Sequence, residues 1–74
     1  MKLRFTYCQP CKNWAQALKD LEQIYMDHNQ RIDAVELVAG DNGVYDVHKD
    51  DELVFSKDQE GRFPEEGEIK ERIG

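Results

Sequence analysis

The stretch Tyr7-Cys8-Gln9-Pro10-Cys11-Lys12 holds both cysteines of this 74-residue chain, where an alternating apolar segment gives way to an amphipathic pattern. Two cysteines separated by two residues at the start of a helix place their sulfurs about one turn apart, close enough for a small disulfide ring. The free N–H groups and positive dipole end of such a helix stabilise a thiolate. Pro10 suits a first helical turn, because its missing N–H is not needed there. The stretch therefore predicts a redox-active pair, Cys8 and Cys11.

Other roles are open to the same two cysteines. A disulfide between Cys8 and Cys11 closes a very short loop, so as a structural staple it would contribute weakly. His28 and His48 could supply further zinc ligands, but their spacing from the cysteines does not match the usual zinc-finger pattern. A metal site shared between two chains, or a pair of small buried hydrophobic side chains, remains an alternative.

The composition indicates one small domain over residues 1–74. Hydrophobic residues make up 39 % and charged residues 35 % of the chain, which is typical of a globular protein, and no apolar run approaches the roughly 18 residues of a membrane span. Residues 41–74 hold eleven acids and five bases, whereas residues 1–40 hold five of each. Because phosphate binding needs a basic face, nucleic acid is not an expected partner, and without an apolar span a membrane is not one either.

The cysteine content also bears on the compartment. The N-terminus lacks the apolar core of a signal peptide. Two cysteines at redox spacing do not form the disulfide framework of a small secreted domain. We therefore expect a cytoplasmic protein, with no cofactor and no metal site within one chain.

The first half of the chain predicts a strand, a helix and a second strand. Residues 2–7 alternate between polar and apolar side chains, which indicates a strand with one buried face. From Pro10 to about Met26, apolar residues recur every three or four positions, which predicts a helix with one buried face. The apolar positions of this helix are Trp14, Ala17, Leu18, Leu21, Ile24 and Tyr25. A strand over 32–38 would follow, parallel to the first, so Cys8 would lie at the carboxyl edge where open α/β sheets place their sites.

The second half predicts a hairpin and a final helix. Residues 44–48 and 52–56 read as two short strands, and the three residues between them make the pair an antiparallel hairpin. A turn over 58–61 and a helix from about Glu65 to Ile73 complete the chain. The predicted fold is α/β (α+β), in the order β-α-β-β-β-α, with a four-stranded mixed sheet and two helices.

This order, with Cys-x-x-Cys after the first strand, is similar to a minimal thioredoxin-like fold, and Cys8-Gln9-Pro10-Cys11-Lys12 looks like the Cys-Gly-Pro-Cys-Lys of thioredoxin. A longer pattern covers nearly the whole chain: Tyr7-Cys8-x-x-Cys11, Gly43-Val44-Tyr45-Asp46-Val47, Ser56-Lys57 and Gly61-Arg62-Phe63-Pro64. This pattern resembles the selenoprotein W, T and H family, also called the Rdx family, in its bacterial cysteine-containing form. The resemblance implies a thiol-based oxidoreductase or redox-regulatory role, with glutathione or protein thiols as partners that dock at the Cys-x-x-Cys edge.

The resemblance leaves the order of attack open. In selenoprotein members the selenocysteine occupies the second motif position, which is Cys11 here, whereas thioredoxin logic makes the first cysteine the attacker. Proximity to the helix N-terminus and the usual exposure of the first position favour Cys8. Cys11 would then resolve the mixed disulfide.

Gly43 stands where thioredoxin has a cis-proline opposite its cysteines. Without a Cβ, Gly43 would let the backbone of a partner approach the thiols, although an ordinary turn glycine with positive φ is an equal alternative. Gln9, Pro10 and Gly43 are therefore the candidate substrate-approach residues. For Ser56, Lys57, Phe63 and Pro64 the sequence suggests no chemical role beyond turn or core packing.

The leading functional hypothesis is a small dithiol protein, Cys8 and Cys11, that exchanges with glutathione or protein disulfides. One alternative is a redox-sensing protein-interaction module without turnover. Another is a metal or iron–sulfur site formed by the cysteine pairs of two chains. The substrate, electron donor, reduction potential and oligomeric state do not follow from the sequence.

Overall fold

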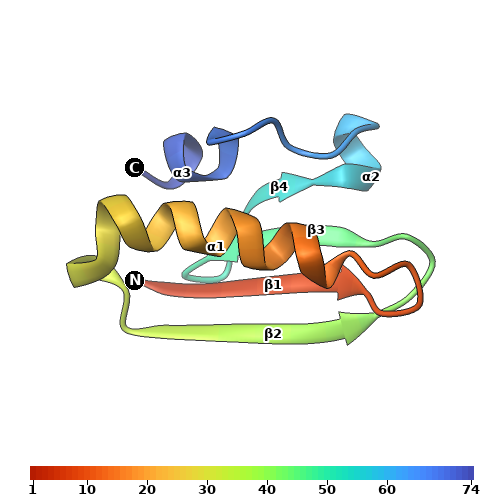
Figure 1. Ribbon diagram of the computed structural model, residues 1–74, viewed down its shortest axis with the longest axis horizontal. Helices are drawn as coiled ribbons and strands as arrows, with labels where there is room; N and C mark the ends of the chain where they lie inside the picture. The colour runs from red at the N-terminus through yellow and green to blue at the C-terminus, as the bar shows by residue number, and fades with distance from the viewer.

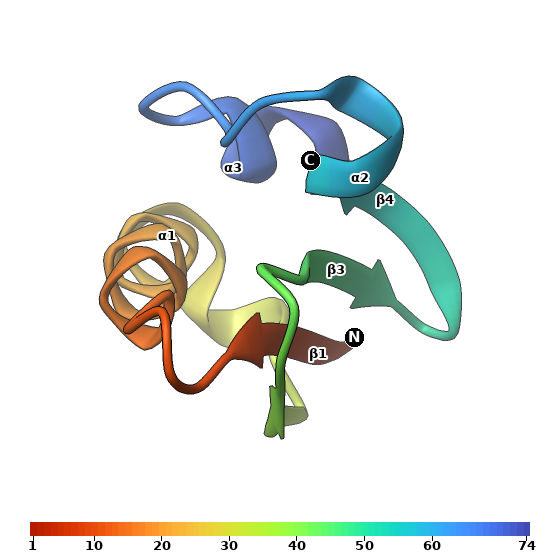
Figure 2. The same ribbon diagram turned by 90° about the vertical axis from the view of Figure 1, so that its right-hand side faces the viewer.

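The computed structural model describes residues 1–74, and in it a four-stranded sheet carries its helices on one face (Figure 1, Figure 2). The strands are β1 (Lys2–Cys8), β2 (Ala34–Gly40), β3 (Tyr45–Lys49) and β4 (Glu52–Ser56). They lie in the order β2-β1-β3-β4, with β1 parallel to β2 and the other neighbours antiparallel. The mixed sheet predicted from the sequence is confirmed, and β1 is one of its two central strands.

The helices are α1 (Trp14–His28), α2 (Lys57–Glu60) and α3 (Glu68–Ile73), with a 3₁₀ turn η1 (Asn29–Arg31) after α1. The predicted order β-α-β-β-β-α is confirmed, with η1 and α2 as additional single turns. The sequence predicts only a turn where α2 lies. This short helix forms because the Ser56 side chain accepts a hydrogen bond from the Gln59 N–H, and it ends at Gly61, which has a φ of 72°. No helix is both long enough and apolar enough to cross a membrane.

Both main helices begin later than the periodicity predicts. Helix α1 begins at Trp14 rather than near Pro10, because the Asn13 N–H donates to the Cys8 carbonyl at 3.1 Å and Lys12 adopts a φ of 63°. These residues form turns, so the prediction that Pro10 lies in the first helical turn is wrong. Helix α3 begins at Glu68 because Gly67, with a φ of 78°, breaks the helical path before it. Strand β2 is likewise displaced by two residues from the predicted range 32–38.

The core lies between the sheet and helices α1 and α3. It consists of Leu3, Phe5, Ala17, Ile24, Tyr45, Val47, Phe55, Ile69 and Ile73. The alternation predicted for the first strand is confirmed, since Leu3 and Phe5 are fully buried while Arg4 is not. Trp14, Leu18 and Tyr25, predicted on the buried face of their helix, are 44 %, 48 % and 43 % exposed, so those predictions are wrong. Helix α1 instead turns Ala17 and Ile24 onto the sheet.

Candidate redox site

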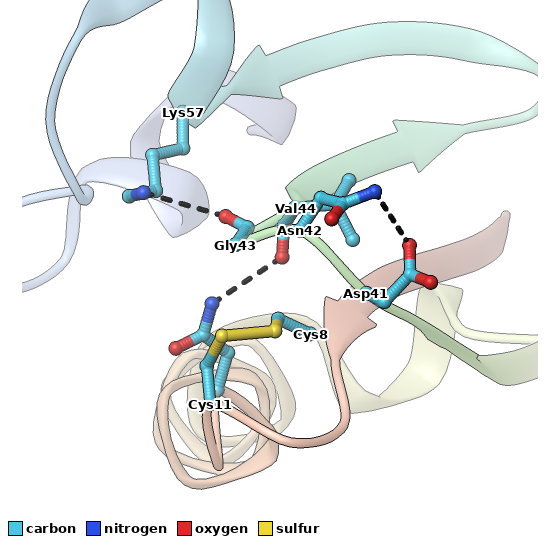
Figure 3. Close-up of a disulfide and its surroundings, with 8 residues drawn as sticks. Cys8, Cys11, Asp41, Asn42, Gly43, Val44 and Lys57 are labelled. Carbon is cyan, nitrogen blue, oxygen red and sulfur yellow. Dashed lines mark hydrogen bonds between the residues drawn. A yellow bond between two sulfur atoms is a disulfide. The ribbon is translucent and has the colours of Figure 1, made fainter.

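The two cysteines form a disulfide (Figure 3), and the burial of the two residues shows that only one of them reaches the surface. Cys8 is the last residue of β1 and is fully buried, whereas Cys11 is exposed, and their Cα atoms lie 5.2 Å apart. The assumption that Cys8 is the more exposed cysteine is therefore wrong. The reason is topological, because Cys8 ends a central strand while Cys11 lies in the turn that leads into α1.

Gln9 and Pro10 are exposed in the turn between the cysteines. The Gln9 N–H donates to the Gly40 carbonyl at 2.9 Å, which fastens the turn to the end of β2. Lys12 is the basic residue that follows this turn. Arg4, which precedes the cysteines in sequence, lies 3.6 Å from Asp51 at the β3–β4 turn. Lys12 is therefore the basic residue next to the cysteines in the sequence, while Arg4 faces Asp51.

The segment Asp41–Val44, called the opposing loop here, lies across from the disulfide in Figure 3. Gly43 in this loop has a φ of 74°, a conformation that side chains with a Cβ rarely adopt. Its carbonyl accepts a hydrogen bond from Lys57 Nζ at 3.3 Å, and the Val44 carbonyl accepts one from Asn13 Nδ2 at 3.3 Å. The opposing loop is therefore held by side chains from both sides.

Asn13 and Lys57 are site residues that the sequence reasoning missed. Asn13 occupies the N-cap position of α1, yet its side chain makes no capping bond and bonds the opposing loop instead. The sequence indicates Lys57 only as part of the family pattern, with no chemical role. Its ammonium lies 5.2 Å from the centre of the Phe63 ring, which in turn lies 5.8 Å from the Tyr45 ring. Of the pattern residues without an assigned chemical role, Lys57 therefore bonds the loop that faces the cysteines, and Phe63 contacts Lys57.

Comparison with known proteins settles the family. The chain matches the Rdx family over residues 2–74. It belongs to the Rdx family. The fold is similar to that of a selenoprotein W-related protein from Vibrio cholerae, with a TM-score of 0.90 at 21 % identity, covering 97 % of this chain and 90 % of that one. A protein from Bordetella parapertussis has the same fold, with a TM-score of 0.90 at 24 % identity over 97 % and 91 % of the two chains. No curated protein matches the chain. The predicted family and thioredoxin-like fold are confirmed.

Behind the opposing loop, this Rdx chain buries a carboxylate against a tyrosine. The Tyr45 hydroxyl donates to Asp20 Oδ2 at 2.5 Å, and Gln16 Nε2 donates to both carboxylate oxygens of Asp20 at 3.1 and 3.2 Å. Asp20 is 2 % exposed. Burial raises the pKa of Asp20 above its usual value, while the hydrogen bonds from Tyr45 and Gln16 act in the opposite direction. Burial and the bond to Asp20 raise the pKa of Tyr45. The pair joins α1 to the first residue of β3.

The histidines of this Rdx protein lie away from the cysteines. His28 ends α1, at the opposite end of the helix from Cys11, and His48 pairs with Arg4 across β1 and β3. No three of its histidine, cysteine, aspartate and glutamate side chains are placed to hold a metal ion.

Proposed function

We propose that this protein is a small thiol–disulfide redox protein that uses Cys8 and Cys11 to exchange electrons with protein disulfides or glutathione. The observation that supports the proposal is the asymmetry of the pair, in which one sulfur is exposed and the other is buried behind it. A reducing cytosol is the proposed compartment, because a lone redox-spaced pair is typical of proteins that cycle there.

In the reduced protein, the Cys11 thiolate attacks one sulfur of the partner disulfide. A bond forms between Cys11 Sγ and that sulfur, the partner disulfide breaks, and the other partner sulfur leaves as a thiolate that takes up a proton. The Cys8 thiolate then attacks Cys11 Sγ, which forms the Cys8–Cys11 disulfide and releases the second partner thiolate. The partner gains two electrons and two protons, and the protein loses them.

Three features favour Cys11 over Cys8 as the attacking residue. Cys11 is exposed, whereas Cys8 is fully buried and is bonded to Cys11. Cys11 also lies closer to the start of α1, and the positive dipole end of a helix favours a thiolate. Lys12, which is also exposed, adds a positive charge beside it. The same order agrees with the resemblance noted above, in which selenocysteine occupies the position of Cys11.

A redox titration tests the function itself. The protein is equilibrated in glutathione or dithiothreitol buffers of graded potential, and the oxidised fraction is read by thiol alkylation and mass. A reversible two-electron transition in the range of known thiol oxidoreductases, roughly −120 to −270 mV, is expected. If no intramolecular disulfide forms at any potential, the proposal fails, and the metal content of anaerobically purified protein becomes the next measurement. A pair that titrates reversibly but does not turn over small disulfides would instead indicate a redox-gated interaction module.

Trapping with single serine variants tests the order of attack. Cys8→Ser keeps the attacking thiol but removes the resolving one, so it should accumulate a mixed disulfide with glutathione when oxidised glutathione is added. Cys11→Ser should accumulate little, because the remaining sulfur is buried. Accumulation in Cys11→Ser alone would reverse the assignment.

A further inference from the structure

Helix α1 leaves a row of large apolar side chains uncovered. Trp14, Leu18 and Tyr25 are 44 %, 48 % and 43 % exposed. Single exposed apolar residues are ordinary, but these three are separated by four and seven positions along one helix. At about 100° per residue, they fall within a stripe roughly 40° wide. The stripe lies on one flank of the core-facing residues Ala17 and Ile24.

Strand β2 adds a fourth exposed apolar side chain on the same side of the sheet. Leu37 is 46 % exposed and pairs with Phe5 in the parallel ladder between β1 and β2. Paired residues of neighbouring strands point to the same face, and Phe5 is buried on the face that carries the helices. Leu37 therefore points to the side of α1. Because β2 is an edge strand, no further strand covers it. These four residues, Trp14, Leu18, Tyr25 and Leu37, are called the α1–β2 patch.

The patch begins at the disulfide. Trp14 lies only three positions after the exposed Cys11, and Figure 1 shows that α1 begins at the end of the sheet where β1 and β2 finish. From Trp14 to Tyr25 the helix spans about 16 Å, the length of about five residues of extended chain. A polypeptide bonded to Cys11 therefore reaches the whole patch, whereas the tripeptide glutathione covers only part of it.

The edge of β2 offers main-chain bonds to the same polypeptide. Its seven residues pair only with β1, so the N–H and C=O groups on the other side of the strand have no strand partner. An extended segment that pairs with this edge places alternate side chains toward α1 and Leu37. The patch and the strand edge thus suit one and the same occupant.

We propose that the α1–β2 patch docks an extended segment of a partner protein, with apolar side chains next to the cysteine that exchanges with Cys11. The docking proposal rests on the proposed redox function and narrows its substrate class to protein disulfides. A second copy of this chain is the less suitable occupant, because each copy carries a net charge of −6.

The rates at which two disulfide peptides react with the protein test the docking site. Two symmetric disulfide-linked peptides of equal length are made, one with Leu and Phe around its cysteine and one with Ser and Gly. The reduced protein is mixed in separate reactions with each peptide and with oxidised glutathione. The second-order rate constant for oxidation of the protein is obtained from the loss of alkylatable thiols, measured by mass. We expect the apolar peptide to react about tenfold faster than the polar one, since docking buries its apolar side chains.

Leu18→Ser and Leu37→Ser should reduce the ratio of the apolar to the polar rate toward one. The ratio is the readout because a change in Cys11 reactivity affects both peptides equally. Met26→Ser is the matched control, since Met26 is 76 % exposed on α1 but lies outside the stripe, and it should leave the ratio unchanged.

The possible failures are distinct. Equal rates with the two peptides and a measurable rate with oxidised glutathione overturn the docking site while the redox function stands. Failure to react with any of the three disulfides overturns both proposals. A dimer that Leu18→Ser dissociates in sedimentation also overturns the docking site, because a second copy would then cover the patch.

Discussion

Lys57 and Asn13 donate hydrogen bonds to the backbone opposite the disulfide, so removing either bond should weaken the hold on the opposing loop. Lys57→Met keeps an aliphatic stem near the Phe63 ring but removes the donor to the Gly43 carbonyl, which lies 3.3 Å away. A lost hydrogen bond of this kind costs about 1 kcal/mol. We expect the free energy of urea unfolding to fall by about that amount and exchange at Cys11 with oxidised glutathione to slow. Lys19→Met, at an exposed lysine without an ion pair, serves as the control. A Lys57→Met protein as stable as the wild type would show that this bond does not hold the loop.

The buried Asp20 carboxyl predicts a dependence of stability on pH. Burial raises its folded-state pKa above the ordinary value of 3.8. The folded protein therefore binds this proton more tightly than the unfolded chain does, so protonation of Asp20 stabilises the fold. This stabilisation is complete below the unfolded pKa and is lost as the pH rises through the folded pKa.

Asp20→Asn keeps an acceptor for the Tyr45 hydroxyl but carries no charge, so it should be more stable than the wild type at neutral pH and lack this pH dependence. Asp20→Ala leaves the hydroxyl without an acceptor and should cost about 1–3 kcal/mol. Urea unfolding between about pH 4 and pH 7 measures both. Asp58→Asn, at an exposed residue, is the control. Greater stability of the wild type than of Asp20→Asn at neutral pH would show that the carboxylate stabilises the fold.

At the scale of elements, an ionic network joins α2 and α3 to β4. Arg62 and Arg72 each bond the Glu68 carboxylate, Arg72 also bonds Glu60, and Arg72 Nη1 donates to the Val54 carbonyl of β4 at 2.9 Å. The hydrogen bond from Arg62 lowers the pKa of Glu68 to about 2 from an ordinary value of 4.5. A carboxylate with a depressed folded pKa stabilises the fold above its unfolded pKa, and this stabilisation is lost as the pH falls toward about 2.

Glu68→Gln should therefore lower the thermal midpoint at neutral pH and lower it less in acid. Thermal unfolding across the acid range measures the difference between variant and wild type. Glu71→Gln is the matched control, because Glu71 lies on the same helix and is exposed without an ion pair. If the thermal midpoint of Glu68→Gln lies below that of the wild type by the same amount at neutral and at acid pH, the negative charge of Glu68 does not stabilise the fold.

The sequence predicts an element correctly when the residues that determine it lie close together in the chain. The alternation of β1 and the three-to-four spacing of α1 are local, so both elements are predicted correctly. The start of α1 depends on a bond from Asn13 back to Cys8 and on a positive φ at Lys12, for which a lysine gives no signal. Periodicity likewise reveals an apolar face but not which part of it the sheet covers, and for that reason Trp14, Leu18 and Tyr25 are placed incorrectly.

At the scale of the whole molecule, the family pattern predicts the cysteine pair and Gly43, but not their surroundings. The burial of Cys8 follows from the central position of β1, and the bonds from Asn13 and Lys57 to the opposing loop join residues 31 and 14 positions apart. Such contacts form only in the folded chain, where the start of α1 and the start of α2 both lie next to the opposing loop. A motif therefore identifies the reacting atoms, while the tertiary fold determines which of them a partner can reach.

The same whole-molecule view predicts what reduction does to the fold. Cys8 is buried but does not belong to the nine-residue core cluster, Cys11 is exposed, and the disulfide joins residues only three positions apart. The loop-entropy relation for so short a loop gives about 2 kcal/mol of stabilisation. We therefore expect reduction to leave the protein folded, with a thermal midpoint lower by about 8–16 °C. Thermal unfolding with and without reductant measures this, and Cys11→Ser should behave like the reduced wild type.

The size of that shift also bears on function, because stability and redox potential are linked. The free energy by which the disulfide stabilises the fold equals the free energy by which the fold stabilises the disulfide. For this two-electron couple, about 1.4 kcal/mol of such stabilisation lowers the reduction potential by 30 mV. A contribution of about 2 kcal/mol therefore moves the potential by only about 40 mV, which leaves the pair open to exchange with cellular thiols. Unfolding on reduction would mean a much larger coupling. The disulfide would then be a structural staple that partners cannot easily reduce, and the proposed exchange at Cys11 would fail with it.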